Sequence, residues 1–452
     1  MIGRGVWNLL LVLVVLGCSV TSTLAAAPFA VTLPLEGYFR PGRYMPVHVT
    51  AAAPDDRNDG LTITANQSVW TFLASEGGKL DTVVPLMPMS AQVPGVSVKW
   101  MIYHGTDIDL PLHPLADNQR LVGFAGAEIG AADALNMARQ LDGQSQWFAE
   151  PLDSSQPVAG IAECWETLDV MVLDGPTFGR IEASKMSSLV AAGVTLLVQS
   201  PRPPDAEWPW RPAMSGWWML RYAPAGPQSA TYSPEAYTAV SYFPGGLVKS
   251  ERWQLVIYGV AIEAAILLLV LIGRRRLGIL WAVVLGGGFL GAAVYLGSWQ
   301  RLSRMIQGSI EVVGPHITQN DVWAFETSPN LAYSRLRWVD GLHLILASGD
   351  QWPGIDARLQ CFANGKPDVL FFNLLPDHKV AVYARRCGPR GPVTMPTTDG
   401  TSPMHILAKD FYLNKGDRIL GQVPTTPLLG EGYFKSELWP TVVIGRSAAD
   451  RD

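Results

Sequence analysis

The side chains best placed for chemistry follow three short apolar segments in the middle of the chain. Residues 120–124, 169–173 and 194–198 are each followed by a turn of small and polar residues. If these segments are parallel strands, their carboxyl ends meet at one edge of a sheet, where α/β proteins bind ligands. The titratable groups at that edge are Glu128 and Asp174. A hydrolase with an unusual site would have to use them.

Established catalytic motifs need more than these turns offer. A nucleophile elbow requires a Ser or Cys between small residues on a tight strand-to-helix turn, and none of the three turns supplies one. The glycines that begin at Gly123 also lack the spacing of the dinucleotide-binding fingerprint. Cys164 precedes the segment 169–173 instead of following it, so we expect a small buried hydrophobe. The sequence therefore predicts no catalytic residue and no cofactor.

The sequence suggests two further hypotheses: a disulfide between two cysteines, and a metal site formed by histidines and aspartates. Cys361 and Cys387 lie beside predicted strands of one domain. They form either a disulfide, which would contribute about 3 kcal/mol, or a buried pair of free thiols. Four side chains able to bind a divalent ion stand close together, but their spacing matches no ligand motif and prolines mark a loop: His104, Asp107, Asp109 and His113. We expect a solvated linker there and no metal.

The elements that must position these residues have the periodicity of an α/β domain, predicted over residues 111–235. The strand at 120–124 is followed by a helical pattern over residues 131–141, and the strand at 169–173 by one over 182–192. Strand, helix and strand within about thirty residues form a βαβ unit, hence a parallel sheet with helices on its faces. A late aromatic cluster either packs over this domain or binds a ligand: Trp208, Trp210, Trp217 and Trp218.

Alternating apolar and polar residues predict β-structure on both sides of this domain. Residues 28–110 fit a small β-sandwich of the immunoglobulin-like type. Its turn with Arg40 and Arg43 leaves these arginines either solvated or in contacts between domains. Residues 305–452 alternate in the same way and predict a C-terminal β-sandwich, and residues 236–253 are a polar linker.

Residues 1–27 have the features of a secretory signal peptide. Arg4 supplies the positive charge, and an apolar stretch and a run of alanines follow. Three outcomes fit this pattern: cleavage in the alanine run, lipidation of Cys18 in a sequence that resembles a lipobox, or retention as an anchor. Each of them places the following residues outside the cytoplasm.

Residues 254–298 predict a hairpin of two transmembrane helices. Residues 255–272 contain one charged side chain and residues 277–297 contain none. Each stretch is long enough to cross a hydrocarbon core of about 30 Å as a helix. The positive-inside rule places the connecting turn in the cytoplasm because of its three arginines: Arg274, Arg275 and Arg276. We therefore expect a bacterial inner membrane protein with both large flanking parts on the periplasmic side.

Three residues of this hairpin predict helix contacts. Glu263 is costly to expose to lipid, so it usually faces a protein partner or is protonated. Gly287 and Gly291 have the spacing that lets two helices approach closely. The two helices either pack against each other through these residues or contact a protein partner in the envelope.

The order of these parts resembles a group of uncharacterised bacterial membrane-anchored proteins. The resemblance rests on residues 37–47 in the first β-domain, on residues 168–174 in the α/β domain and on the membrane segments that follow. In that group the α/β domain is similar to the flavodoxin-like fold of class I glutamine amidotransferases. Active amidotransferases need a cysteine at a strand-to-helix elbow, and this chain has none there. The resemblance therefore implies a non-catalytic domain used for binding or assembly.

Composition excludes one class of function. The formal charge is −5 and 16% of the residues are charged, so nothing suggests the basic surface that nucleic-acid binding needs. The predicted fold class is a multidomain α/β plus all-β protein with a transmembrane helical hairpin. Its predicted function is non-enzymatic scaffolding, binding or sensing in the envelope. The alternatives are an envelope hydrolase and an accessory subunit of a membrane transporter.

Overall fold

The computed structural model describes fifteen stretches of the chain. They are residues 29–51, 60–65, 68–73, 80–88, 91–93, 95–100, 108–226, 304–327, 332–337, 341–347, 357–361, 367–374, 379–390, 403–424 and 435–446. The predicted signal peptide, with Cys18, lies outside these residues. All structural statements below concern the described residues.

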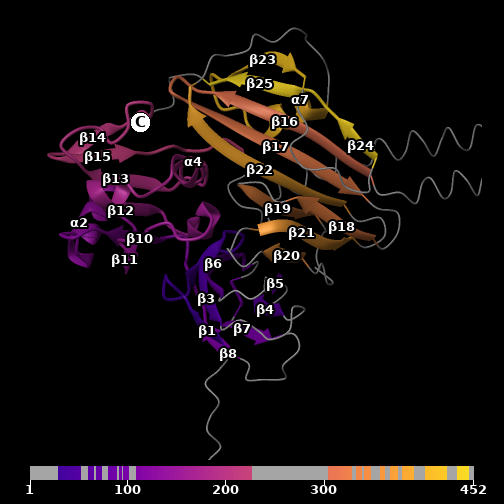
Figure 1. The fold of residues 1–452 in the computed structure, drawn as a ribbon. Helices are drawn as coiled ribbons and strands as arrows, with labels where there is room; N and C mark the ends of the chain where they lie inside the picture. The colour runs from indigo at the N-terminus through magenta and orange to yellow at the C-terminus, as the bar shows by residue number, and fades with distance from the viewer. Residues whose placement is uncertain are drawn as a thin grey trace, which may run out of the picture.

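A six-stranded sheet, here called the central sheet, forms the α/β part of the chain (Figure 1). Its strands are, in spatial order, β11 (Gln146–Pro151), β10 (Gln119–Ala125), β12 (Val170–Asp174), β13 (Thr195–Gln199), β15 (Trp217–Leu220) and β14 (Arg211–Met214). The first four strands are parallel and the last two are antiparallel to them. The parallel pairing of β12 with β10 and β13 confirms the predicted βαβ unit.

Short helices connect the strands of the central sheet. They are α2 (Ala131–Leu141), the 3-10 helix η1 (Ala162–Trp165), α3 (Gly175–Phe178) and α4 (Ala183–Ala191). Helix α4 buries Met186, Leu189 and Val190, as its periodicity predicts. It is followed by Gly193 at φ +83°, a left-handed conformation that glycine adopts without strain. Helices α2 and α4 are amphipathic, because each buries one apolar face and exposes the other.

Strands from the beginning of the chain form a small sheet and half of a larger one. The N-terminal sheet contains β1 (Phe29–Thr32), β3 (Met45–Ala51) and β6 (Leu80–Leu86). A two-stranded ribbon pairs β2 (Tyr38–Phe39) with β9 (His113–Pro114). The larger sheet, here called the shared sheet, has the order β18 (Ala332–Arg337), β21 (Pro367–Leu374), β20 (Ala357–Cys361), β5 (Ser68–Leu73), β4 (Gly60–Ala65), β7 (Gly95–Trp100) and β8 (Ile108–Pro111). Because β20 pairs with β5, the two predicted β-domains are joined through one sheet.

The C-terminal sheet packs against the α/β part of the chain. Its order is β19 (Leu342–Ala347), β22 (Lys379–Pro389), β17 (Ile317–Thr327), β16 (Arg304–Val313), β25 (Thr441–Gly445) and β23 (Arg418–Val423), with β24 (Lys435–Leu438) also paired to β16 and helix α7 (Pro403–Phe411) on one face. Helix α4 lies between the central sheet and β22 (Figure 1). Ile317 and Cys387 of the C-terminal sheet share a buried apolar cluster with α4 and the central sheet.

The predicted fold class needs correction. Strands dominate the described residues, and the helices among them are short, α2 being the longest α-helix at 11 residues. A helix needs roughly 20 apolar residues to cross a membrane. Within the described stretches, none reaches the length and apolarity of a membrane span. The α/β and all-β parts are therefore present without the transmembrane hairpin in the fold that the structure describes.

Residues 254–298 lie outside the described stretches, and so do the residues assigned to helix contacts and to the cytoplasmic turn: Glu263, Gly287, Gly291, Arg274, Arg275 and Arg276.

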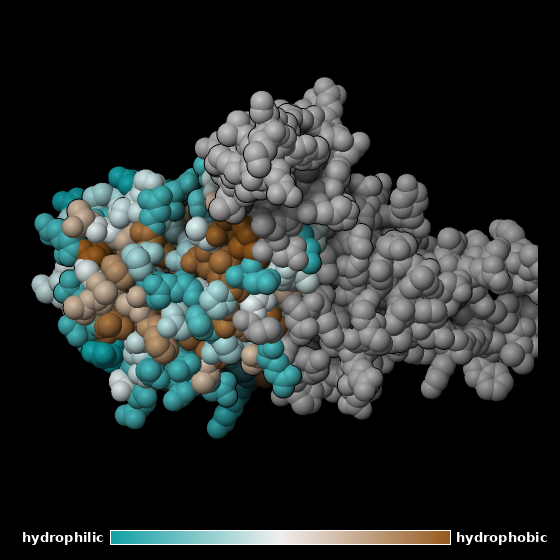
Figure 2. Space-filling view, turned by 90° about the horizontal axis from the view of Figure 1, so that it is seen from below, coloured by the Kyte–Doolittle hydropathy of each residue, from teal (hydrophilic) through white to brown (hydrophobic). Residues whose placement is uncertain are grey.

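One face of the described chain is mixed in polarity. Figure 2 shows that polar residues cover much of this face and that apolar residues form smaller patches between them. Folded proteins ordinarily expose this much apolar surface. The polarity of this face therefore does not indicate a docking surface.

Candidate functional site

The carboxyl edge of the central sheet does not assemble the predicted hydrolase site. Asp174 accepts hydrogen bonds from the backbone N–H of Ala127 (2.9 Å) and of Thr177 (2.8 Å), so its carboxylate joins two turns and caps α3. Burial raises the pKa of Asp174, but these hydrogen bonds outweigh it and the pKa is lowered overall. Glu128 is exposed to solvent. Asp174 therefore has a structural role at this edge.

The tryptophan-rich segment packs onto the α/β domain. Trp208 and Trp210 are buried, and the ring of Trp210 meets Phe178 of α3 edge to face with centroids 5.4 Å apart. Trp217 and Trp218 lie in β15, and the indole N–H of Trp218 donates to the carbonyl of Ser200 (3.1 Å). Of the two interpretations weighed from the sequence, packing is the one that these contacts support.

A pocket of about 470 Å³ lies at the opposite, amino edge of the central sheet. Arg120, Asp169 and Thr195 stand at or next to the starts of β10, β12 and β13 and line it. The N-terminal turn and the C-terminal sheet complete the wall, so three distant parts of the chain meet there. We call it the arginine pocket because five arginines line it against three carboxylates: Arg40, Arg43, Arg120, Arg221 and Arg385, with Asp142, Glu166 and Asp169.

Arg40 ties the N-terminal turn to the central sheet. Its Nη2 donates to Asp169 Oδ2 (2.8 Å) and to the carbonyl of Gln119 (2.6 Å). Its backbone N–H donates to Thr167 Oγ1 (3.0 Å). Its Nε is buried and has no hydrogen-bond partner within the described chain. A donor left unsatisfied in this way costs free energy unless a ligand or water accepts from it.

Nearby carboxylates compensate the charge of Arg43 only in part. Within the described chain, the one hydrogen bond of its side chain goes from Nη1 to the backbone carbonyl of Glu166 (3.3 Å). Burial lowers the pKa of the Arg43 guanidinium, Asp169 and Glu166 raise it, and Arg40 lowers it further. Desolvation prevails, which means that the neighbouring carboxylates do not fully offset the cost of burying this charge.

The remaining wall of the pocket combines an exposed arginine with a neutralised one. Arg221 is exposed and forms no ion pair within the described chain. Arg385 of β22 is buried, and its Nη2 lies 2.7 Å from Asp321 Oδ2 on β17. Arg221 belongs to residues 221–226, here called the strap, which leave β15 and run along the C-terminal sheet. The strap residues Arg221 to Pro224 line the pocket.

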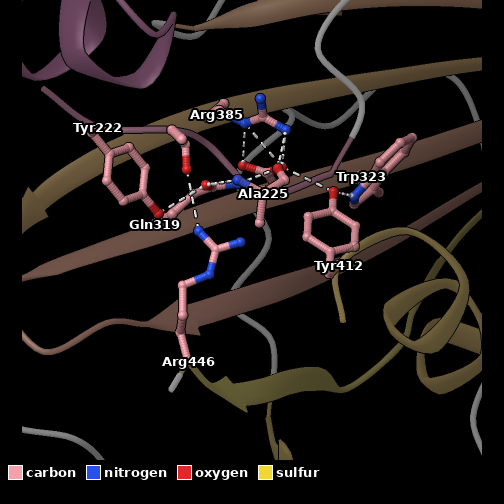
Figure 3. A network of polar contacts seen from close by, with 9 residues as sticks. Tyr222, Ala225, Gln319, Trp323, Arg385, Tyr412 and Arg446 are labelled. Atoms are coloured by element: carbon pink, nitrogen blue, oxygen red, sulfur yellow. Dashed lines mark hydrogen bonds and ion pairs between the residues drawn. The ribbon is translucent and has the colours of Figure 1, made fainter. Parts of the chain in front are cut away.

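The buried ion pair is the centre of a polar network shown in Figure 3. Tyr412 donates its hydroxyl hydrogen to Asp321 Oδ2 (2.9 Å) and accepts from the indole N–H of Trp323 (2.7 Å). Burial lowers the pKa of Arg385, but Asp321 and Tyr383 raise it more, so the guanidinium is held above its usual range. With Arg385 paired to Asp321, the charge open to a ligand comes mainly from Arg43 and Arg221, and in part from Arg120, whose Nε lies 4.0 Å from Asp169 Oδ1.

The arrangement suits an anion. Arginine forks match the planar geometry of carboxylates and of phosphate oxygens and bind them with two parallel hydrogen bonds. The pocket supplies an excess of such groups, a desolvated guanidinium at Arg43 and an unused donor at Arg40. Among the described residues that line the pocket there is no serine, cysteine or histidine that could act as a nucleophile or as a general base at neutral pH.

The other predicted site residues are scattered. Asp109 and His113 are exposed, His104 and Asp107 lie outside the described residues, and no metal-ligand group was found in the described part. Cys164 is buried among apolar side chains. Cys387 is a free buried thiol in β22, Cys361 lies in β20 of another sheet, and the structure does not join them.

Reasoning from the sequence missed the arginine pocket. It placed Arg40 and Arg43 in a turn, either solvated or between domains, and contacts between domains are what the structure shows. Arg40 and Asp169 are 129 residues apart, so no local spacing reveals their contact. The one available signal was the pair of arginines on a short turn beside a tyrosine that proves to be fully buried, Tyr44.

Comparisons with known proteins give little guidance. No protein family and no curated protein matches this sequence. Among solved structures, an M1 zinc metallopeptidase from Deinococcus radiodurans matches with 17% identity over 21% of this chain and a TM-score of 0.12. A substrate-bound variant of that peptidase matches with 16% identity and the same TM-score. This chain spans 22% of the length of either one, and likenesses this weak carry no argument about function.

Proposed function

We propose that this protein is a non-enzymatic binding protein that holds a small anionic ligand, a carboxylate or a phosphate, in the arginine pocket. The observation that carries the proposal is the partly buried, undercompensated Arg43 beside the unused Nε of Arg40. A bound anion would offset the desolvation of Arg43 and accept from Arg40. Since three parts of the chain form the pocket, the ligand would also hold them together, which suits a scaffolding or sensing role.

We also propose that the protein acts in the bacterial envelope. The support is the signal-like sequence of residues 1–27. Fractionation of cells that produce the full chain tests this location. Recovery of the protein with the envelope fraction is expected, and recovery with the cytoplasm alone would refute it.

Thermal unfolding with a panel of anions tests the proposed ligand class. Phosphate, pyrophosphate and citrate are added to the full chain at constant ionic strength, with sodium chloride as the reference. A ligand at one hundred times its Kd stabilises the folded state by about 2.7 kcal/mol, so at least one anion should raise the Tm clearly.

Variants show whether the stabilisation comes from this pocket. Arg43→Gln and Arg120→Gln should reduce it, while Arg202→Gln, which alters an exposed arginine outside the pocket, should leave it unchanged. Equal Tm values in all four salts would contradict the proposal. Stabilisation that survives both pocket substitutions would place the anion elsewhere.

A further inference from the structure

The strap is an irregular segment that belongs to no sheet and is buried at Ala225. Residues 221–226 have no regular secondary structure, yet Ala225 is only 3% exposed. A buried backbone needs hydrogen-bond partners, and strands normally obtain them from neighbouring strands. The strap obtains them from side chains of the C-terminal sheet instead (Figure 3).

Gln319 of β17 binds both backbone groups of Ala225. Its Oε1 accepts from the N–H of Ala225 (2.8 Å), and its Nε2 donates to the carbonyl of Ala225 (2.9 Å). The same Oε1 accepts from the hydroxyl of Tyr222 (3.1 Å). Arg385 adds a hydrogen bond to the carbonyl of Ala225 (2.8 Å), and Arg446 adds one to the carbonyl of Ala223 (3.2 Å).

One face of β17 contacts the strap. Alternate residues of a strand share a face, and the sequence along this face runs from apolar to polar and back to apolar. Ile317 packs with the α/β core, Gln319 and Asp321 are both 0% exposed, and Trp323 packs with α7. These two polar side chains are buried beneath Ala225 of the strap. Gln319 binds the backbone of Ala225 directly, and Asp321 pairs with Arg385, which binds the carbonyl of Ala225.

A glycine ends the strap where it crosses an aromatic ring. Gly226 has φ +81°, and a Cβ atom there would lie 2.6 Å from the ring of Tyr412. Tyr412 itself donates to Asp321, so the strap, the ion pair and the ring form one packed unit. The docked strap is therefore a specific arrangement with defined contacts at Ala223, Ala225 and Gly226.

We propose that Gln319 is a positioning residue of the arginine pocket, so that docking of the strap and binding of an anion stabilise each other. The proposal rests on the proposed function, because the strap carries Arg221 and Tyr222 in the wall of that pocket. Gln319 does not line the pocket and acts only through the strap. If the anion binds more tightly when the strap is docked, linkage requires that the anion also favours docking.

Hydrogen exchange and titration together test this coupling. In the full chain, saturating citrate or pyrophosphate should slow exchange of the Ala225 amide about fivefold or more, since that amide donates to Gln319. Gln319→Leu should weaken both anions roughly tenfold, within the range of known couplings. Gln307→Leu is the matched control, because Gln307 is also buried and lies on the neighbouring strand β16. Ile306 and Ile310 of that strand face the core around α7, so Gln307 belongs to the opposite face of the sheet, away from Gln319. This control should bind within about twofold of the unaltered chain.

The outcomes separate the two proposals. If neither anion binds the unaltered chain, the proposed function and this inference both fail. If an anion binds, but exchange of the Ala225 amide does not respond and Gln319→Leu retains full affinity, this inference alone fails. Should Gln319→Leu not fold, Arg446→Lys is the second variant. It keeps the positive charge but removes the Nη1–H that donates to the strap carbonyl of Ala223, and it should weaken binding a few-fold. Unchanged affinity in Arg446→Lys together with an unresponsive Ala225 amide would overturn the inference.

Discussion

Removal of Arg385 is the most demanding stability test of the buried network. Asp321 is 0% exposed and Arg385 is 4% exposed, and their side chains are joined by contacts of 2.7, 3.0 and 3.1 Å. Arg385→Met keeps the aliphatic bulk but leaves the Asp321 carboxylate buried with the hydroxyl of Tyr412 as its remaining hydrogen-bond donor among the contacts above. Breaking a buried ion pair from one side costs about 3–5 kcal/mol. We therefore expect a loss of this size in the free energy of unfolding.

The double variant Arg385→Met/Asp321→Leu separates the lost attraction from the stranded charge. Replacing both partners of a buried pair with apolar residues is often close to neutral. Here the hydroxyl of Tyr412 would lose its acceptor, at a cost of about 1–3 kcal/mol. The double variant should therefore be more stable than Arg385→Met alone, which is a strongly non-additive result.

Urea unfolding followed by tryptophan fluorescence measures both quantities, since Trp323 lies within the network. A loss below about 1 kcal/mol in Arg385→Met would show that the pair is not buried as described. A double variant that loses the sum of the two single losses would refute the stranded-charge reasoning.

Two further predictions concern other parts of the fold. Burial, assisted by Glu36, raises the pKa of Glu150 from 4.5 to about 7, so the folded chain keeps a proton that the unfolded chain releases; stability should fall as the pH rises from about 4.5 to about 7 and then level off. Glu150→Gln should remove this dependence from the Tm, and an identical pH profile would contradict the assignment. Gly341→Ala should destabilise the chain by about 3 kcal/mol or more, because Gly341 has φ +79° and a Cβ there would lie 2.0 Å from the carbonyl oxygen of Arg385. Gly216→Ala has the same backbone strain at φ +77° with open space around it, and urea midpoints should show a clearly smaller loss for it.

Those structural features that depend on residues close together in the sequence were predicted correctly. The βαβ unit and the inward face of α4 follow from local periodicity, and the structure confirms both. Local patterns also predicted β-structure on both sides of the α/β domain. They could not show that β5 and β20 pair although Phe72 and Cys361 are 289 residues apart, because alternation specifies a strand and not its partner.

The candidate site was beyond prediction for the same reason. Reasoning from α/β sheets directs attention to the carboxyl edge, where Asp174 serves as a helix cap. The arginine pocket lies at the amino edge and exists only because Arg43, Arg120 and Arg385 come together from three segments. Individually each arginine resembles an ordinary surface residue. Their role in a pocket depends on burial and on contacts between distant parts of the chain, which the spacing of residues along the sequence does not reveal.

Calorimetric titration of citrate and of pyrophosphate into the full chain tests the central claim most directly. The account predicts saturable binding of at least one of them to a single site. It predicts affinity reduced about tenfold or more in Arg43→Gln, since a hydrogen bond to a charged group contributes about 1.5–3 kcal/mol. Arg202→Gln should bind as the unaltered chain does. Absence of binding at low ionic strength, or equal affinity in Arg43→Gln, would contradict the account.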